Sequence, residues 1–172
     1  MVDMTQALPK ELESTAVIRF QDCDPFQHLN NARYIDYVFN AREDQLIKFY
    51  GFSIFEHSKT HNAAWVVTKT QIAYLYPAGV AEEVVIKTRL LQMSETTLVV
   101  EGIMFDSNLK RPKAVLWVEF TYVSLATGRT AKHPDDLMEL FKVVRVDDEY
   151  QPNGFDQRVE NVKRQYRKQP AQ

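Results

Sequence analysis

The sequence predicts an α+β fold in which an antiparallel sheet wraps around one long central helix. Apolar residues recur every three or four positions over 32–49, the period of an amphipathic helix. Four later runs alternate with a period of two and are rich in β-branched and aromatic residues. Short turns separate the last three runs, which favours antiparallel neighbours because a parallel crossover needs a dozen or more residues.

The individual elements follow from these periods and from the residues that interrupt them. Gly51 ends the central helix, and 51–62 is expected to be a loop with a single helical turn. Pro134, with acidic residues after it, predicts the start of a second, short helix that runs through Phe141. We expect strands at Thr15–Phe20, Ala64–Tyr76, Glu83–Gln92, Thr97–Asp106 and Lys113–Leu125.

A chain of 172 residues is long enough for one domain with a substantial core. Residues 1–14 are polar and are expected to form a flexible N-terminal arm, with the single domain at 15–146. Residues 147–172 form a polar C-terminal extension, interrupted by proline and glycine. Its locally basic end is interpreted as a solvated tail or short helix, in preference to a nucleic-acid arm.

Composition restricts the possible functions. A hydrophobic content of 45% suits a globular protein, and a formal charge of −2 gives no basic field for nucleic acid or an anionic membrane. One cysteine allows no intrachain disulfide, so a reducing compartment is expected. The N-terminus shows no signal-peptide pattern and no run reaches the ~20 apolar residues of a membrane span. We therefore expect a soluble cytoplasmic protein.

The stretch before the central helix carries the polar residues with chemical possibilities. Pro25 disfavours the α conformation at Asp24, so the pair predicts a bend. Asn30 and Asn31 then offer side chains that can cap the helix. A carboxylate and His28 therefore precede the N-terminus of a helix that is largely buried.

Asp24 is a candidate nucleophile or general base, and a turn-forming Asp before proline is the alternative. His28 could hold a water, donate to a carbonyl or orient the carboxylate; a hydrogen-bonded turn histidine explains it equally well. The backbone N–H of Asn31 lies where the first turn of a helix leaves donors without intrahelical partners. Such a donor can stabilise an oxyanion.

Other candidate residues are weaker. Cys23 is flanked by Asp22 and Asp24, whose negative charges raise the pKa of a thiol and disfavour the thiolate. His57 and His61 are four residues apart but lack the arrangement of a zinc-protease motif, so no metal site is predicted.

These residues carry a family resemblance. Asp22-Cys23-Asp24-Pro25, followed by His28-Leu29-Asn30-Asn31-Ala32-Arg33-Tyr34 and a helix, resembles the hotdog-fold acyl-CoA thioesterases of the 4-hydroxybenzoyl-CoA thioesterase branch. The turn is also similar to one in plant acyl-ACP thioesterases, although Phe26 replaces an asparagine of their pattern. The likeness is sharpest over Ile18–Arg42 and continues, by order of elements, to about Phe141.

The resemblance implies a hotdog fold, a homodimer or homotetramer joined edge to edge, and hydrolysis of an acyl-CoA without cofactor or metal. It implies that Asp24 is the catalytic carboxylate and Asn31 the oxyanion donor, with His28 in support. Phe26, Asn30 and Tyr34 are the candidate substrate contacts, although core packing explains the aromatic rings equally well.

The carrier of the acyl group stays open at this point. The turn at 93–96 is neutral to acidic, where the 4-hydroxybenzoyl-CoA enzyme has a basic cluster. Lys110, Arg111 and Lys113 are the nearest substitute, and a solvated charged turn is the preferred interpretation. Acyl-ACP hydrolysis and a non-catalytic hotdog module that binds an acyl group or only assembles are therefore the alternatives.

Overall fold

The computed structural model describes residues 7–146 and 150–167. A short 3-10 turn at Phe20–Asp22 precedes the first helix. The strands are β1 (Glu11–Val17), β2 (Ala63–Tyr74), β3 (Glu83–Met93), β4 (Thr97–Asp106) and β5 (Pro112–Ser124). The helices are α1 (Arg33–Tyr50), α2 (Ile54–His61), α3 (Asp135–Val144) and α4 (Phe155–Arg167).

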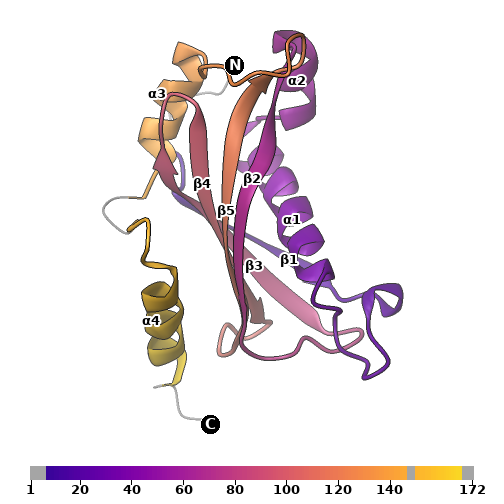
Figure 1. Ribbon diagram of the computed structural model, residues 1–172. Helices are drawn as coiled ribbons and strands as arrows, with labels where there is room; N and C mark the ends of the chain where they lie inside the picture. Colours follow the sequence, from indigo (N-terminus) through magenta and orange to yellow (C-terminus); the bar gives the residue numbers. More distant parts are fainter. Residues whose placement is uncertain (1–6, 147–149, 168–172) are drawn as a thin grey trace.

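The five strands form one antiparallel sheet in the order β1-β3-β4-β5-β2, with α1 lying along one of its faces (Figure 1). The predicted α+β class and the antiparallel sheet around a central helix are confirmed. The helix predicted over 32–49 is α1, and Gly51 ends it with a left-handed φ of 63°.

The helix α1 lies close against the sheet at Gly102 of β4. Tyr34, Val38 and Ala41 recur along one face of α1 and are buried against the strands. A Cβ atom at position 102 would overlap with Cγ1 of Val38, so only glycine allows the helix to lie this close. This contact fixes the height of α1 above the sheet.

The opposite face of the sheet is covered by α4, in the segment for which the sequence predicted a solvated tail or a short helix. Its Phe155, Val159 and Val162 pack on a sheet surface that includes Ile103 and Trp117. Figure 1 shows α4 on the side of the sheet away from α1. Of the expected polar extension at 147–172, residues 155–167 are therefore an amphipathic helix that covers apolar surface, while 147–149 and 168–172 lie outside the described residues.

The strands β2, β3 and β5 differ from their expected ranges by one or two residues at an end, and larger differences occur at the first strand and at the loop after α1. The strand expected at Thr15–Phe20 begins at Glu11 instead, because Leu12 is fully buried and pairs with Thr88, so residues 11–14 are not part of an arm. Residues 1–6 of that arm lie outside the described residues. The expected helical turn within 51–62 is the eight-residue helix α2, and Pro134 precedes α3 as its N-cap.

Within the described part of the chain, no helix is both long and apolar enough to cross a membrane.

Candidate active site

The loop before α1 closes tightly on Asp24. One carboxylate oxygen, Oδ1, accepts hydrogen bonds from the backbone N–H of Phe26 at 2.9 Å and of His28 at 3.1 Å. The Asp24 N–H donates to the carbonyl oxygen of His28 at 2.8 Å. Gln27 supplies the reversal with a positive φ of 64°. The turn-forming role that the sequence suggested for Asp24 is therefore real, and it uses only one of the two carboxylate oxygens.

The second oxygen, Oδ2, accepts no hydrogen bond from any residue that the structure describes. Asp24 is partly exposed, so this oxygen is open to a substrate or a water molecule. The two N–H bonds to Oδ1 meanwhile fix the plane of the carboxyl group. Asp24 thus combines a fixed orientation with a free oxygen, as a nucleophile or general base requires.

The loop is fastened to the body of the protein by backbone hydrogen bonds. The Leu29 N–H donates to the carbonyl oxygen of Ala78 at 2.8 Å, and the Val80 N–H donates to that of Gln27 at 2.9 Å. Leu29 is buried in the core, and these two hydrogen bonds flank an isolated antiparallel bridge between His28 and Gly79, in the segment that precedes β3. The position of Asp24 is therefore set by the sheet as well as by its own turn.

The start of α1 differs from the expected capping arrangement. Ala32 is the N-cap, and no side chain caps the helix directly. The Asn30 side chain instead accepts from the N–H of Ala32, the N-cap residue, at 3.0 Å. The Asn31 side chain makes no cap bond, and the backbone carbonyl oxygen of Asn31 accepts from the Tyr74 hydroxyl at 2.8 Å.

The Asn31 N–H has no hydrogen-bond partner among residues 7–146 and 150–167. The Asn30 N–H beside it donates to the carbonyl oxygen of Asp22 at 2.9 Å, which draws the start of α1 against the loop that holds Asp24. An unpaired donor at a helix N-terminus lies in positive potential. It is therefore suited to donate a hydrogen bond to a carbonyl oxygen and to stabilise the negative charge that develops there.

The remaining predicted site residues are spread between surface and core. The His28 side chain is exposed, and only its backbone contacts Asp24. Phe26 stands at the tip of the loop with 79% of its surface exposed. Tyr34 is buried, and its hydroxyl accepts from the Ala78 N–H at 3.2 Å. The structure thus gathers Asp24, His28, Asn30 and Asn31 in one loop and places the Tyr34 ring in the core beneath them.

The two aspartates of the motif have different surroundings. Asp22 accepts from the Tyr37 hydroxyl at 2.9 Å and lies 3.9 Å from Nε of Arg33. Burial and the charges of Asp22 and Asp24 raise the pKa of the Cys23 thiol between them. The thiol donates to the carbonyl oxygen of Arg19 at 3.4 Å. Asp22 therefore holds the loop in place, and Cys23 is kept in its non-nucleophilic form.

Tyr74 is the residue near the site that sequence reasoning missed. It was placed correctly in the second strand, but its bond to Asn31 joins residues 43 positions apart, and no local pattern announces it. Its ring also packs edge-on against Tyr34 at a centroid distance of 5.2 Å. The C-terminal end of β2 therefore lies beside the start of α1.

The histidine pair considered for metal binding is engaged elsewhere. His57 Nε2 lies 2.8 Å from the Tyr122 hydroxyl, and His61 Nδ1 donates to the carbonyl oxygen of His57 at 3.2 Å. Their rings stack at 4.1 Å. Across the described residues, no group of three or more histidine, cysteine or acidic side chains is placed to hold a metal ion.

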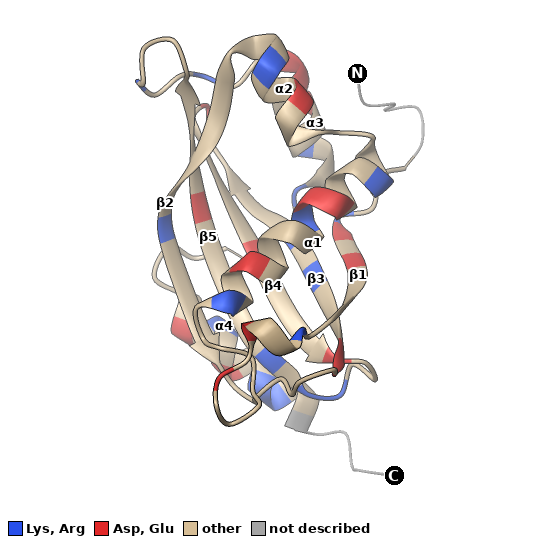
Figure 2. Cartoon of the chain, turned by 90° about the vertical axis from the view of Figure 1, so that its right-hand side faces the viewer, with Lys and Arg blue, Asp and Glu red and all other residues tan. Residues whose placement is uncertain are grey.

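The basic residues considered for coenzyme A also separate into two groups. Lys113 is buried, and its Nζ contacts the carbonyl oxygen of Pro77 at 2.8 Å and Oε1 of Glu82 at 2.7 Å. Lys110 and Arg111 are exposed in the turn between β4 and β5. Because Lys113 is held by the segment that pairs with the Asp24 loop, this turn lies at the same end of the sheet. Figure 2 shows several basic positions at that end of the molecule.

The chain is similar to known thioesterases in sequence and in fold. The chain is 25% identical over 128 residues to the long-chain acyl-CoA thioesterase FadM of Escherichia coli K12, a match that covers 74% of this chain and 95% of FadM. The fold is similar to that of a 1,4-dihydroxy-2-naphthoyl-CoA thioesterase from Synechocystis, with a TM-score of 0.69, 12% identity, and coverage of 82% and 99% of the two chains. It is also similar to a 12:0-ACP thioesterase from Umbellularia californica, with a TM-score of 0.68, 12% identity, and coverage of 80% and 51%.

The neighbours identify the sheet around α1 as the hotdog fold. The family model of the thioesterase-like superfamily matches residues 18–141, which include the Asp24 loop, α1 and all strands from β2 to β5. The chain belongs to the thioesterase-like superfamily.

Proposed function

We propose that this thioesterase hydrolyses acyl-CoA at the start of α1, with Asp24 as the catalytic carboxylate and the Asn31 N–H as the oxyanion donor. The observation that carries the proposal is the free Oδ2 of Asp24, held in a loop that also presents an unpaired helix-start N–H. A binding module would need neither feature. The FadM match supports an acyl-CoA as the substrate.

Two routes use the same geometry. In one, Asp24 Oδ2 attacks the thioester carbonyl carbon, the oxyanion is held by the Asn31 N–H, and the thiolate leaves to give a mixed anhydride that water then hydrolyses. In the other, Asp24 takes a proton from water, and the resulting hydroxide attacks the carbonyl carbon directly. Either route consumes one water molecule and yields a free acid and a free thiol, without a cofactor.

Different exposed residues of the site can contact different parts of the substrate. Lys110 and Arg111 offer charges for the phosphates of coenzyme A at this end of the sheet. Phe26 offers an exposed aromatic surface for the acyl group, and His28 and Asn30 offer polar contacts beside it. Tyr34, which is buried, contributes by supporting the loop through the Ala78 N–H.

The proposed active form is a homodimer that pairs along β2. This strand is an edge of the sheet, and residues 66–70 are exposed on both of its faces, including the apolar Val66 and Val67. An uncovered apolar edge strand favours pairing with another strand. Because Tyr74 joins the end of β2 to Asn31, a second copy along this edge would lie next to Asp24.

Release of free thiol from a panel of acyl-CoAs tests the reaction. The panel runs from acetyl-CoA to palmitoyl-CoA, with 4-hydroxybenzoyl-CoA as an aryl thioester and lauroyl-ACP as the alternative carrier. We expect turnover of at least one acyl-CoA with kcat/KM above ~10⁴ M⁻¹s⁻¹, the lower end for enzymes. A preference for lauroyl-ACP would show that acyl carrier protein, and not coenzyme A, carries the acyl group. Binding without release of thiol from any member of the panel would show that the protein is a binding module.

Light scattering tests the assembly. We expect a mass at least twice the 20.0 kDa of the chain, and a smaller mass for Val67→Lys, which places a charge on the β2 edge. Val143→Lys is the matched control because Val143 is similarly exposed, on α3. A monomer that turns over acyl-CoA at full rate would contradict the dimer while leaving the reaction intact.

A further inference from the structure

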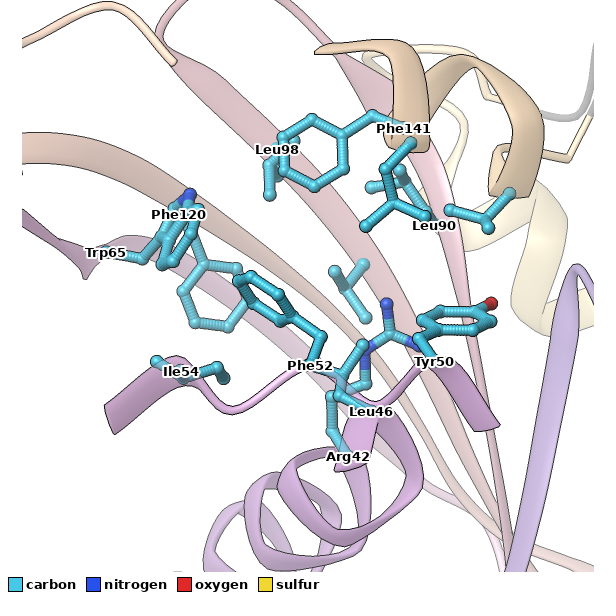
Figure 3. A pocket seen from close by; sticks show the side chains of 13 residues that line it. Arg42, Leu46, Tyr50, Phe52, Ile54, Trp65, Leu90, Leu98, Phe120 and Phe141 are labelled. Carbon is cyan, nitrogen blue, oxygen red and sulfur yellow. The ribbon is translucent and has the colours of Figure 1, made fainter. Parts of the chain in front are cut away.

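A cavity at the C-terminal half of α1 has no role in the proposed reaction. Its volume is about 90 Å³, and it lies between α1, the sheet and α3 (Figure 3). Its lining is aliphatic and aromatic, with rings from Phe52, Trp65 and Phe141, except for the single charged residue Arg42. Arg42 is eleven residues beyond Asn31. At 1.5 Å per helical residue this is about 16 Å from Asn31.

The Arg42 guanidinium has little inside the protein to balance its charge. Nη1 donates to Oγ1 of Thr88 at 3.1 Å, and no carboxylate pairs with Arg42 among the described residues. The Thr88 hydroxyl itself donates to Gln45, whose Nε2 is bound by Ser14 and the carbonyl oxygen of Ile86. The network therefore ends in neutral groups. Burial lowers the pKa of Arg42 to about 10, which still leaves it charged at neutral pH.

Two other half-buried arginines of this chain, Arg89 and Arg158, have a different environment. Nη2 of Arg89 and Nε of Arg158 each lie 2.8 Å from a carboxylate oxygen of Glu101, on the opposite face of the sheet. Removing a charge from water is costly unless an opposite charge and hydrogen bonds compensate for it. Glu101 supplies that compensation for Arg89 and Arg158, whereas Arg42 has only a hydroxyl group. The guanidinium donors of Arg42 that Thr88 does not use are therefore suited to a bound anion.

We propose that this cavity binds a small monocarboxylate, with the carboxylate on Arg42 and an aliphatic or aromatic body against Trp65 and Phe141. A guanidinium can hold both oxygens of a carboxylate in parallel hydrogen bonds. The lining excludes a polar body, and Figure 3 shows the guanidinium between Leu46 and Tyr50, facing the apolar side chains. A cavity of about 150 Å³ accepts benzene, so about 90 Å³ with an open side suits a body of roughly four to six carbon atoms.

The site follows from the cavity and its charge and does not rest on the proposed hydrolysis. The methylene groups of a long acyl chain carry no negative charge, so they could not balance the charge of the Arg42 guanidinium. The cavity is therefore not suited to the uncharged part of such a chain. Carboxylic acids are nevertheless the products of thioester hydrolysis. A site of this kind on a thioesterase would respond to the concentration of a short acid.

Titration with hexanoate at neutral pH tests the proposal, with hexanamide as a neutral compound of the same shape. Because Trp65 lines the cavity, its fluorescence and the melting temperature both report binding. We expect saturable binding of hexanoate, and binding of hexanamide at least ~10-fold weaker because it cannot pair with the guanidinium charge. Equal binding of the two compounds would overturn the proposal. So would the absence of saturation by hexanoate up to roughly 50 mM, a concentration above the dissociation constants expected for a fragment-sized ligand.

Variants locate the binding. Arg42→Met keeps an unbranched side chain without charge, and we expect its affinity for hexanoate to fall at least ~10-fold. Arg129→Met is the matched control, since Arg129 is exposed and outside the cavity, and it should bind hexanoate as the unmodified protein does. Asp24→Asn should also retain hexanoate binding, which separates this site from the active site. Unchanged binding by Arg42→Met would contradict the assignment, and the hexanamide comparison decides the question if that variant does not fold.

Discussion

The two ends of α1 treat polar groups in opposite ways. At the N-terminal end, Asp24 Oδ2 and the Asn31 N–H have no hydrogen-bond partner in the described chain, and both lie at the surface. At the C-terminal end, the buried polar groups are paired. Trp65 Nε1 donates to His133 Nε2 at 3.0 Å, and His57 contacts Tyr122 at 2.8 Å.

The difference separates a reactive end from a structural end on one helix. Unsatisfied groups are inexpensive at the surface, where water replaces the missing partner until a substrate arrives. In the interior the same groups would lower the free energy of unfolding, so pairing is the rule there. Arg42 is half-buried and is paired only with the Thr88 hydroxyl, without a carboxylate, which distinguishes its cavity from the surrounding aromatic cluster. Substitutions at the two ends should accordingly change different measured quantities.

The largest effect is expected for Asp24→Asn at the reactive end. Asparagine retains the size and the turn-forming hydrogen bonds to Phe26 and His28 but loses the free carboxylate oxygen. We expect kcat to fall at least ~10²-fold, with little change in melting temperature. The measurement is steady-state turnover of the best acyl-CoA together with thermal unfolding.

Asp22→Asn is the control for this substitution, because the Asp22 carboxylate accepts a hydrogen bond from the Tyr37 hydroxyl and has no proposed role in the reaction. It should retain more activity than Asp24→Asn while losing more stability. Turnover by Asp24→Asn close to that of the unmodified protein would move the catalytic role to another residue.

The second effect concerns the contact between α1 and the sheet at Val38 and Gly102. Gly102→Ala adds a Cβ atom that overlaps with Val38, and relief requires α1 to move away from the sheet. Overpacking of this kind costs about 1–3 kcal/mol in the free energy of unfolding. For a chain of this length that is a fall in melting temperature of about 2–4 °C per kcal/mol.

Two further variants sharpen the Gly102 measurement. Val38→Ala removes the overlapping methyl groups, so the double variant should lose less stability than the sum of the two single variants. Gly79→Ala is the control, because its Cβ atom would meet only Oε2 of Glu82, at 3.7 Å. Equal losses for Gly102→Ala and Gly79→Ala would show that α1 is less closely constrained than its packing indicates.

The smallest effect at any single pH is expected from the histidines of the structural end. Burial lowers the pKa of His133 and of His57, and His61 and His133 lower that of His57 further, against an opposing contribution from Asp136. The unfolded chain therefore binds more protons than the folded one below the ordinary pKa of 6.5. Stability is complete above that value and declines as the pH falls from it toward the lowered pKa values of the folded protein.

We expect the melting temperature to fall between about pH 7.5 and about pH 5.5, the interval that spans the ordinary histidine pKa. His133→Gln keeps an oxygen acceptor for Trp65 but does not titrate in this range, so the dependence should be shallower. His28→Gln makes the same substitution at the exposed reactive end, outside the aromatic cluster that contains His133, and is the matched control. If the melting temperature changed equally with pH in the unmodified protein and in both variants, His133 would not be the cause of the pH dependence.

Periodicity was sufficient to predict the sheet and α1, because each buries one face and so imposes a regular pattern on its residues. The helix α2 was expected only as a single helical turn, although its start carries a local signal. Ser53, its N-cap, accepts from the N–H of Glu56 at 3.2 Å in a Ser-x-x-Glu sequence. The helix α4 carries a signal as well, in the spacing of Phe155, Val159 and Val162, but it lies in a segment whose overall polarity concealed the stripe.

The candidate site was predictable only in part. Asp24 and the start of α1 are close in sequence, so a turn and a helix boundary were enough to place them together. Tyr74 and Gly79 reach the same loop from distant segments, and contacts of that kind depend on the register of the sheet. Arg42 could not be recognised either, since a charge on an apolar helix face reads as surface until the elements that enclose it are known.

The position of α4 in the chain has a consequence for folding during synthesis. Ribosomes complete β5 before they complete α4, and at about 5–20 residues per second the interval is on the order of seconds. Until α4 arrives, Ile103 and Trp117 face water, and Glu101 has Arg89 beside it without Arg158. Each nascent chain therefore passes through a stage with an exposed apolar sheet face, and crowding of such chains on one messenger favours their aggregation before the last helix can cover it.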